Sequence, residues 1–185
     1  MKRSEAVARC YQIPGMCWPT ELGVLWDLFH GTTRHVEIGT YCGRSLFVTA
    51  MTAAEGAEII SVEPLIPVDQ HMWPMPSPDW QRASLYATLD AIRYHRPDLR
   101  LTHLERTSVD ACREFEGVAS SIYIDGDHNF AEVLADIQGW RTRLAEGGIL
   151  AGHDYWPTDP GVIEAVHASG FGFEAIPNTR IFRLT

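Results

Sequence analysis

Basic residues are scarce in this sequence. Its 185 residues include 15 lysines and arginines against 24 aspartates and glutamates, which gives a formal net charge of -9. Lys2 is the only lysine. Proteins that bind nucleic acid through a positive groove need clustered Lys and Arg to neutralise the phosphates. We therefore expect no nucleic-acid partner.

Cysteines and long apolar runs are also few. The four cysteines, Cys10, Cys17, Cys42 and Cys112, form no CxxC pair and no paired spacing with histidine, so the sequence indicates neither a zinc site nor a disulfide framework. No apolar stretch approaches the roughly 20 residues of a membrane helix, and no signal-peptide pattern follows the basic N-terminal residues. We expect a cytoplasmic protein with no membrane partner.

The overall composition is typical of a folded protein. Hydrophobic residues make up 45% of the chain and charged residues 21%, and this length predicts one compact domain over residues 1–185. Five prolines between residues 64 and 78 predict a long loop. The segment 1–30 is expected to be helical. Its apolar residues at helical spacing are Leu22, Leu25, Trp26 and Phe29.

Short β-like runs alternate with helical patterns along the rest of the chain. The predicted strands are 35–39, 58–62, 99–104, 121–124, 148–152, 171–176 and 180–184. The predicted helices are 44–55, 79–95, 109–115, 129–144 and 160–168. Such alternation predicts a parallel sheet covered on both faces. Gly147 and Gly148 are expected to end the helix before them, and the turn signal Pro177-Asn178 predicts a closing hairpin with an antiparallel strand.

Ligands of open α/β sheets bind at the carboxyl ends of the strands, so the loops there are the candidate sites. In the first loop, Gly39 and Gly43 permit a tight turn and close approach of a ligand to backbone N–H groups. Tyr41 stands where a pyrophosphate needs a small residue, which disfavours a dinucleotide. Glu63 follows Gly43 by twenty residues, at the end of the second strand, where a carboxylate can accept hydrogen bonds from a ribose. Together these features favour an adenosine-type cofactor over the alternatives of a sharp turn and a solvated carboxylate.

Two later blocks carry more specific patterns. Residues 124–130 read IDGDHNF and residues 152–155 read GHDY. With VEIGTYCGRS at residues 36–45, they resemble the class I S-adenosylmethionine-dependent methyltransferases over about residues 35–155. The resemblance is to the small-molecule O-methyltransferase branch, which includes macrolide-sugar and rhamnosyl methyltransferases and cephalosporin-hydroxylase-like proteins. It implies a Rossmann-like, doubly wound α/β fold with a seven-stranded sheet of order 3-2-1-4-5-7-6 and one antiparallel strand.

The resemblance also implies S-adenosylmethionine as the cofactor. Residues of the first loop would cradle its amino-acid end: Gly39, Thr40, Tyr41, Gly43 and Ser45. Glu37 would support that loop, and Glu63 would hold the ribose. Ser108, next to Thr107, corresponds to the contact with the adenine edge, and Asp125 would lie close to the reacting methyl group.

In metal-dependent relatives, the positions of Asp125, His153 and Asp154 bind one divalent cation. Such an ion, Mg²⁺ or Mn²⁺, lowers the pKa of a coordinated hydroxyl. Relatives usually carry an acid or amide where this chain has His153, and imidazole shifts the preference toward Mn, Fe or Zn. The alternative is that His153 caps a strand end and that Asp154 binds substrate or a helix terminus.

His128 occupies the position of the proposed general base in the resembling sugar methyltransferases. Histidine has a pKa near neutrality, so it can accept a hydroxyl proton without a large shift. Asp127 would orient the ring or bind acceptor hydroxyls. The alternative is that His128 belongs to the N-cap region of the following helix.

Four aromatic residues are predicted to line the rim of this site, since tryptophan on loops often lines pockets. They are Trp73, Trp80, Tyr155 and Trp156. Residues 71–75 are the candidate segment for acceptor recognition. The short chain leaves little room for an accessory cap, so either the acceptor is small or a second subunit of a homo-oligomer completes the pocket.

The sequence therefore predicts S-adenosylmethionine-dependent O-methyl transfer to a small hydroxylated molecule. One alternative is a binding module that keeps the nucleoside pocket and transfers nothing, because a fold does not guarantee a reaction. The other alternative is a hydroxylase-associated protein of the same fold.

Overall fold

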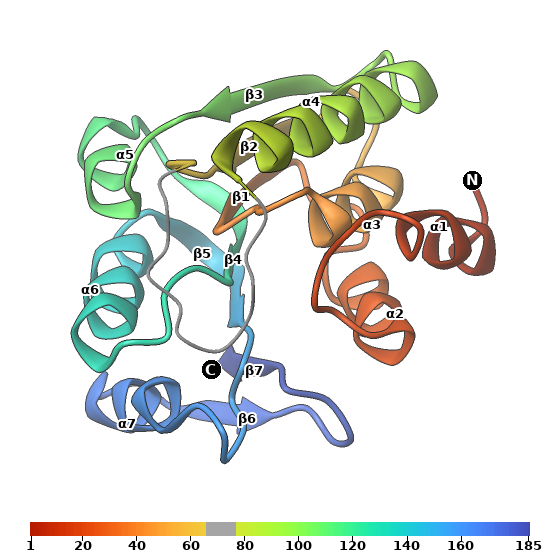
Figure 1. The fold of residues 1–185 in the computed structure, drawn as a ribbon. Helices are drawn as coiled ribbons and strands as arrows, with labels where there is room; N and C mark the ends of the chain where they lie inside the picture. The colour runs from red at the N-terminus through yellow and green to blue at the C-terminus, as the bar shows by residue number, and fades with distance from the viewer. Residues whose placement is uncertain (66–76) are drawn as a thin grey trace.

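Strands alternate with helices along most of the chain in the computed structural model, which describes residues 1–65 and 77–185 (Figure 1). The helices are α1 (Arg3–Cys10), α2 (Pro19–Leu28), α3 (Arg44–Thr52), α4 (Pro78–His95), α5 (Ser108–Glu114), α6 (Phe130–Arg141) and α7 (Pro160–Ala168). The strands are β1 (Arg34–Ile38), β2 (Glu58–Val62), β3 (Arg100–Leu104), β4 (Ala119–Ile124), β5 (Leu144–Gly152), β6 (Phe173–Ala175) and β7 (Phe182–Leu184).

The seven strands form one sheet in the order β3-β2-β1-β4-β5-β7-β6. Pairing is parallel from β3 to β5, and β7 is antiparallel to both β5 and β6. The predicted strand order and the closing antiparallel hairpin are confirmed. Because β1 lies between β2 and β4, the loops after these three strands meet at one edge of the sheet.

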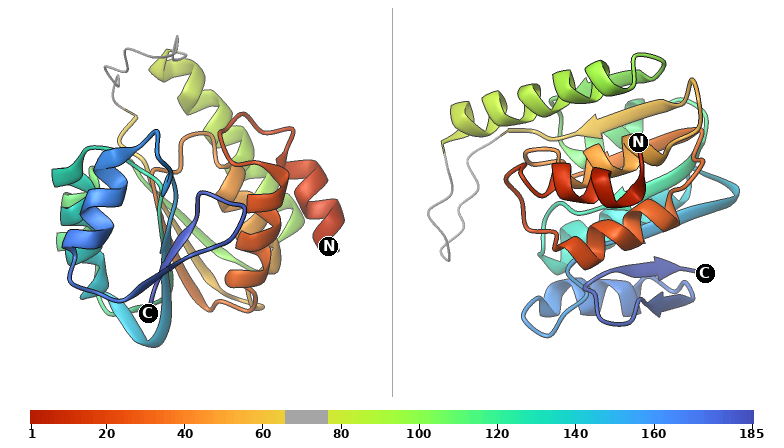
Figure 2. Two further views of the ribbon diagram at one scale, coloured as in Figure 1. Left: turned by 90° about the horizontal axis from the view of Figure 1, so that it is seen from below. Right: turned by 90° about the vertical axis from the view of Figure 1, so that its right-hand side faces the viewer.

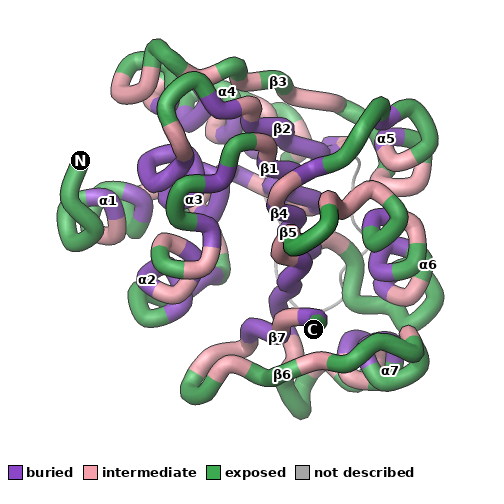
Figure 3. The backbone as a smooth tube through the Cα atoms, turned by 180° about the vertical axis from the view of Figure 1, so that it is seen from behind, coloured by how far each residue is buried: buried purple, intermediate pink, exposed green. Residues whose placement is uncertain are grey.

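Helices cover both faces of the sheet (Figure 2). One core packs residues of α1 to α4 against the sheet, and the second packs residues of α5 to α7 against the opposite face. Successive residues of β2 contribute to different cores, Ile59 to the first and Ile60 to the second. This is why the central strands read as continuous apolar runs rather than as alternating ones, and why they are buried along their length (Figure 3).

The N-terminal segment contains two helices, α1 and α2, rather than one. Both pack on α3. The apolar residues that predicted a helix all lie on or beside α2, so the spacing indicated the second helix correctly and did not reveal the first.

The glycine pair Gly147-Gly148 lies inside β5, and the prediction that it ends the preceding helix is wrong. Helix α6 ends at Arg141, and β5 begins at Leu144. The pairing of β5 with β4 shifts between Ala119 and Ser121, and Gly147 has φ +71°. The pair therefore accommodates an irregularity in the sheet, because glycine adopts this left-handed conformation without strain.

Two further features bear on the sequence predictions. Within the part of the chain that the structure describes, no helix is long and apolar enough to cross a membrane. The proposed acceptor segment 71–75, including Trp73, lies outside the described residues.

Candidate active site

The loop after β1 touches the loop after β4. Gly39 has φ +77°, and its N–H donates to the Val62 carbonyl at 2.9 Å. A Cβ atom on Gly39 would lie 2.1 Å from the Asp125 carbonyl oxygen, so only glycine allows this approach. The close contact brings the predicted cofactor loop beside the DGDH corner.

Glu63 holds the same loop from the end of β2. Its carboxylate accepts from the backbone N–H of Tyr41 at 2.8 Å and of Leu65 at 3.2 Å. Burial raises the pKa of this carboxyl. Tyr41 and Leu65 both have left-handed backbone conformations, with φ +50° and +52°. The Glu63 carboxylate therefore binds two residues in a conformation that non-glycine residues rarely adopt.

Glu37 lies buried beneath the loop. Its Oε1 atom accepts from the Ser45 hydroxyl at 3.0 Å, and Oε2 has no hydrogen-bond partner among the described residues. Burial raises the pKa of Glu37 well above its ordinary value. Thr40 is tied to the same region, because its hydroxyl oxygen accepts from Ser61 at 2.9 Å.

Ser108 points into the packing between α5 and α6. Its hydroxyl donates to Asp136 and accepts from Trp140 Nε1 at 2.9 Å. The Ser108 hydroxyl is therefore engaged by the Asp136 and Trp140 side chains.

His128 lies between two carboxylates. Its Nε2 atom is 3.0 Å from Asp154 Oδ2, and its Nδ1 atom is 2.9 Å from Asp159 Oδ1. The hydrogen bond with Asp154 and the negative charge of both carboxylates raise the pKa of His128 to about 9. The expectation of a near-neutral pKa without a large shift is therefore wrong. The helix that follows has Asn129 as its N-cap residue, so the His128 side chain does not serve as that cap.

Asp127 does not orient the His128 ring. Its Oδ1 atom accepts from both the backbone N–H and the side-chain amide of Asn129 at 2.6 Å. The expected orienting role belongs instead to Asp154 and Asp159. Asp127 is exposed, which leaves its other expected role, contact with acceptor hydroxyls, open.

His153, Asp125 and Asp154 come together as the sequence predicted. His153 Nδ1 is 3.3 Å from Asp125 Oδ1 and 3.2 Å from Asp154 Oδ2. Burial opposes a charge on His153, but Asp125, Cys17 and Asp154 together outweigh it and raise the His153 pKa well above its usual range. Asp154 has φ +57°, a conformation that aims its carboxylate at both histidines and at Arg180, whose Nη1 is 3.2 Å from Asp154 Oδ1.

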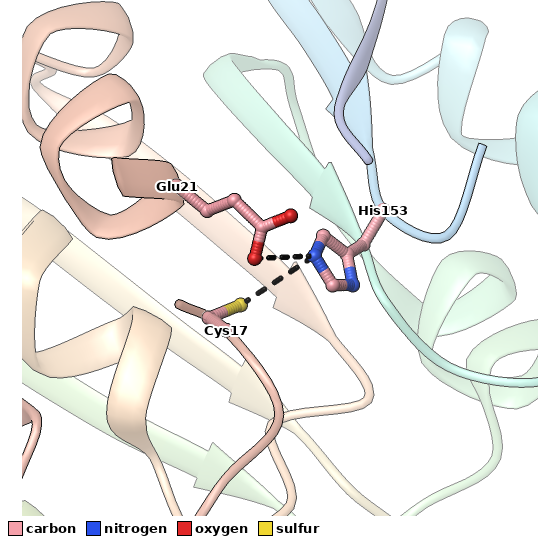
Figure 4. A group of neighbouring side chains, drawn as sticks. All are labelled: Cys17, Glu21 and His153. Carbon is pink, nitrogen blue, oxygen red and sulfur yellow. Dashed lines mark hydrogen bonds and ion pairs between the residues drawn. The ribbon is translucent and has the colours of Figure 1, made fainter. Parts of the chain in front are cut away.

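Glu21, which no sequence motif indicated, reaches His153 from α2 (Figure 4). Glu21 Oε2 lies 3.3 Å from His153 Nε2 and accepts from the Trp18 N–H at 2.8 Å. Its Oε1 atom accepts from the Arg180 N–H at 3.0 Å. Although burial opposes ionisation, these partners lower the pKa of Glu21 to about 2. The one available signal was a carboxylate directly before Leu22, on the apolar face of a helix.

The aromatic residues at the rim differ in their surroundings. Tyr155 donates to or accepts from His167 Nε2 at 3.0 Å and packs against Phe173 and Phe182. Trp80 and Trp156 are exposed. Tyr155 is therefore a packing residue of the C-terminal hairpin, and the expected rim role is left to Trp80 and Trp156.

Comparison with known proteins agrees with this architecture. Residues 36–155 match a family of methyltransferase domains. Three similar solved structures share 12 to 15% identity with the chain. An O-methyltransferase of Bacillus cereus in complex with S-adenosylhomocysteine has 13% identity and a TM-score of 0.69, covering 98% of this chain and 90% of its own.

The other two are enzymes of natural-product biosynthesis. The O-methyltransferase TomG of Streptomyces achromogenes, in complex with S-adenosylmethionine, has 12% identity and a TM-score of 0.68, covering 99% of this chain and 89% of its own. CalS11, a TDP-rhamnose 3'-O-methyltransferase of calicheamicin biosynthesis, has 15% identity and a TM-score of 0.60, covering 98% and 93%. Because the family match spans most of the chain, from β1 to the end of the GHDY block, this protein belongs to the methyltransferase domain family.

Proposed function

We propose that the protein transfers a methyl group from S-adenosylmethionine to an oxygen atom of a small hydroxylated molecule. Family membership and the cofactor-bound structural neighbours support this proposal. One observation carries it: the contact of Gly39 with Asp125 brings the loop after β1 beside a cluster of carboxylates and histidines. An electrophile held by the loop and a hydroxyl held by the cluster would lie next to each other.

The cofactor end of the site is built from the first loop and the strand end beside it. S-adenosylmethionine supplies an electrophilic methyl group. The buried Glu37 Oε2 atom, without a partner among the described residues, is an acceptor suited to an ammonium group such as that of an amino acid. Around it, the loop residues would bind the amino-acid end: Gly39, Thr40, Tyr41, Gly43 and Ser45. Glu63 would hold the ribose, the Ser108 loop the adenine edge, and Asp125 would lie closest to the methyl group.

His128 accepts the proton in this mechanism. S-adenosylmethionine would supply the methyl group, whose bond to sulfur would break as its bond to the acceptor oxygen forms, and the hydroxyl proton would pass to the imidazole of His128. The ring must be neutral to accept it, and with a pKa of about 9 the neutral form is the minor one near pH 7, so turnover should rise as the pH approaches 9. Asp154 and Asp159 contact the two ring nitrogens, so one of these carboxylates must move aside for the acceptor hydroxyl, and both would stabilise the new imidazolium. Asp127, exposed beside the ring, would bind acceptor hydroxyls.

A divalent cation fits the group Asp125, His153 and Asp154. Donor atoms of the three residues lie within 4.8 Å of one another. His153 Nδ1 is buried, makes no hydrogen bond within the described chain and faces a carboxylate oxygen on either side. Bound Mg²⁺ or Mn²⁺ would lower the pKa of an acceptor hydroxyl. These three residues would hold it.

The same proposal covers the setting in which the protein acts. All four cysteines are free, which fits a reducing cytoplasm. The acceptor is a small molecule, and the protein binds it as the single domain 1–185 or as a homo-oligomer whose second copy completes the pocket.

Release of S-adenosylhomocysteine in the presence of phenols, catechols and nucleotide sugars tests the proposal. We expect turnover with a member of this panel, and His128→Ala should lower kcat by about 10²- to 10⁴-fold, the usual contribution of a general base. His30→Ala, which removes an exposed histidine that follows α2 and contacts Thr52 at the end of α3, is the matched control and should keep turnover. Full activity in His128→Ala would exclude the base role, and binding of the cofactor without turnover of any acceptor would favour the binding module.

A further inference from the structure

Cys17 and Glu21 lie beside His153 on the side that faces away from Asp154. The three buried side chains are of types that commonly bind metal ions. Cys17 precedes α2, Glu21 lies in its first turn, and His153 follows β5 (Figure 4). The three residues are at most 3% exposed. His153 Nε2 is 3.3 Å from Glu21 Oε2 and 3.9 Å from Cys17 Sγ. Cys17 Sγ is also 3.9 Å from Asp125 Oδ2.

These distances are close to the edges of a tetrahedral zinc site. With Zn–S near 2.3 Å and Zn–N and Zn–O near 2.1 Å, tetrahedral angles place nitrogen and oxygen ligands about 3.4 Å apart, and sulfur about 3.6 Å from either. The observed separations of 3.3 Å from His153 Nε2 to Glu21 Oε2 and 3.9 Å from His153 Nε2 to Cys17 Sγ differ from these values by a few tenths of an ångström. Small side-chain movements would therefore form the site.

Glu21 is already oriented for such a role. Its Oε1 atom accepts from the Arg180 N–H at 3.0 Å, and Arg180 Nε lies 3.5 Å from the same oxygen. The Trp18 N–H donates to Oε2 at 2.8 Å and fixes the direction in which this oxygen faces the imidazole. Metal-ligating carboxylates are commonly held by such outer hydrogen bonds.

We propose that Cys17 Sγ, Glu21 Oε2 and His153 Nε2 bind a zinc ion as its three protein ligands, since the three ligand atoms lie within 4.8 Å of one another. The sulfur ligand selects Zn²⁺ over Mg²⁺. Binding releases the thiol proton and the proton on Nε2. His153 Nδ1 then carries the remaining ring proton beside Asp125 Oδ1 and Asp154 Oδ2, at 3.3 and 3.2 Å. A small rotation of the ring would let it donate to one of them, the usual carboxylate–histidine–zinc arrangement.

The zinc site is distinct from the cation site of the proposed function. That site uses His153 through Nδ1 and contains no sulfur, whereas the zinc site uses Nε2 and Cys17. A zinc ion on Nε2 leaves Nδ1 protonated, so it removes the nitrogen ligand from the Mg²⁺ or Mn²⁺ site. Zinc and the harder cations therefore compete for one imidazole.

Cobalt(II) is the probe that separates the two sites, because a thiolate ligand produces a charge-transfer absorption in the near ultraviolet and oxygen ligands do not. The purified full chain is titrated with CoCl₂ alone, under reducing conditions. We expect this band in the wild-type protein, its loss in Cys17→Ser, and its retention in Cys10→Ser, which replaces a buried cysteine of α1. Glu21→Gln should weaken cobalt binding by more than the roughly 10- to 100-fold that an outer-shell change costs.

Asp154→Asn distinguishes this inference from the proposed function. It removes a ligand of the Mg²⁺ or Mn²⁺ site but only an outer-shell partner of the zinc site, so the thiolate band should remain. Absence of the band in the wild-type protein, or its persistence in Cys17→Ser, overturns the zinc site. The zinc site is also overturned if cobalt binds without producing the thiolate band and this binding is lost in Asp154→Asn. That outcome leaves the methyl-transfer proposal intact. Far-ultraviolet circular dichroism confirms that each variant is folded.

Discussion

Gly39 and Gly56 share a backbone conformation but not an environment. Their φ angles are +77° and +71°. A Cβ on Gly39 would overlap the Asp125 carbonyl oxygen, whereas a Cβ on Gly56 would meet nothing within 4 Å. The pair therefore separates the effect of left-handed strain from that of the contact between the two active-site loops.

Gly39→Ala should destabilise the protein more than Gly56→Ala. Left-handed strain alone costs about 1–2 kcal/mol at either position, and overpacking at Gly39 adds about 1–3 kcal/mol. Urea unfolding measures the difference in the free energy of unfolding. If both variants lose the same stability, the loops after β1 and β4 are not in contact as described.

The imidazole of His128 shows how neighbours change a residue's chemistry. The ordinary pKa of histidine is near neutrality, which suits a general base. Two carboxylates raise the pKa of His128 to about 9. The residue type is readable from the chain. Its proton affinity depends on Asp154 and Asp159, which lie 26 and 31 positions away in the sequence.

Helices α5 and α6 are joined by a buried polar contact. Asp136 of α6 is 6% exposed and accepts from Ser108 at the start of α5. Burial raises the pKa of Asp136 from 3.8 to about 6. A raised carboxyl pKa contributes stability that is fully present below the ordinary value and is lost as the pH rises through the folded-state value.

Asp136→Asn should therefore gain stability relative to the wild type as the pH rises from 4 to 8. The shift of roughly two pKa units corresponds to about 3 kcal/mol, and asparagine keeps an oxygen that can accept from Ser108. Denaturant unfolding at both pH values measures the effect. Asp90→Asn, at an exposed position of α4, should show little pH-dependent change, and an equal pH dependence in both variants would contradict the burial argument.

The arrangement of the whole sheet brings the cofactor loop and the acidic cluster to one edge. The strands β2, β1 and β4 must be neighbours in the sheet to form the site, because the loop after each of them contributes to it. Residues from the N-terminal helix α2 and from the C-terminal hairpin then close the same edge through Glu21 and Arg180. A ligand bound there would link segments from both ends of the chain.

S-adenosylhomocysteine should raise the melting temperature of the protein, and NAD should not. A ligand that binds only the folded state at 100 times its Kd stabilises by about 2.7 kcal/mol. For a chain of this size, that corresponds to an increase of about 5–10 °C. Differential scanning calorimetry measures it. Stabilisation by NAD in place of S-adenosylhomocysteine would contradict the assigned cofactor class.

Much of the architecture was readable in advance. Apolar periodicity and turn residues predicted the strands, the main helices and the closing hairpin, because these signals act between residues close together in the chain. The strand order came from the family resemblance of the motif blocks. The assignment of Gly147-Gly148 failed because apolar spacing at Leu144 fits a helix as well as a strand, and pairing with β4 decides between them.

The chemistry of the site depended on contacts between distant segments. The motifs named Asp125, His128, His153 and Asp154, but not Glu21 or Cys17, whose local patterns are those of packing residues. Charge interactions fall off with distance in space rather than along the chain. Folding alone determines that Glu21 faces His153 Nε2, that Asp159 faces His128, and that Asp127 accepts from Asn129 instead of from the His128 ring.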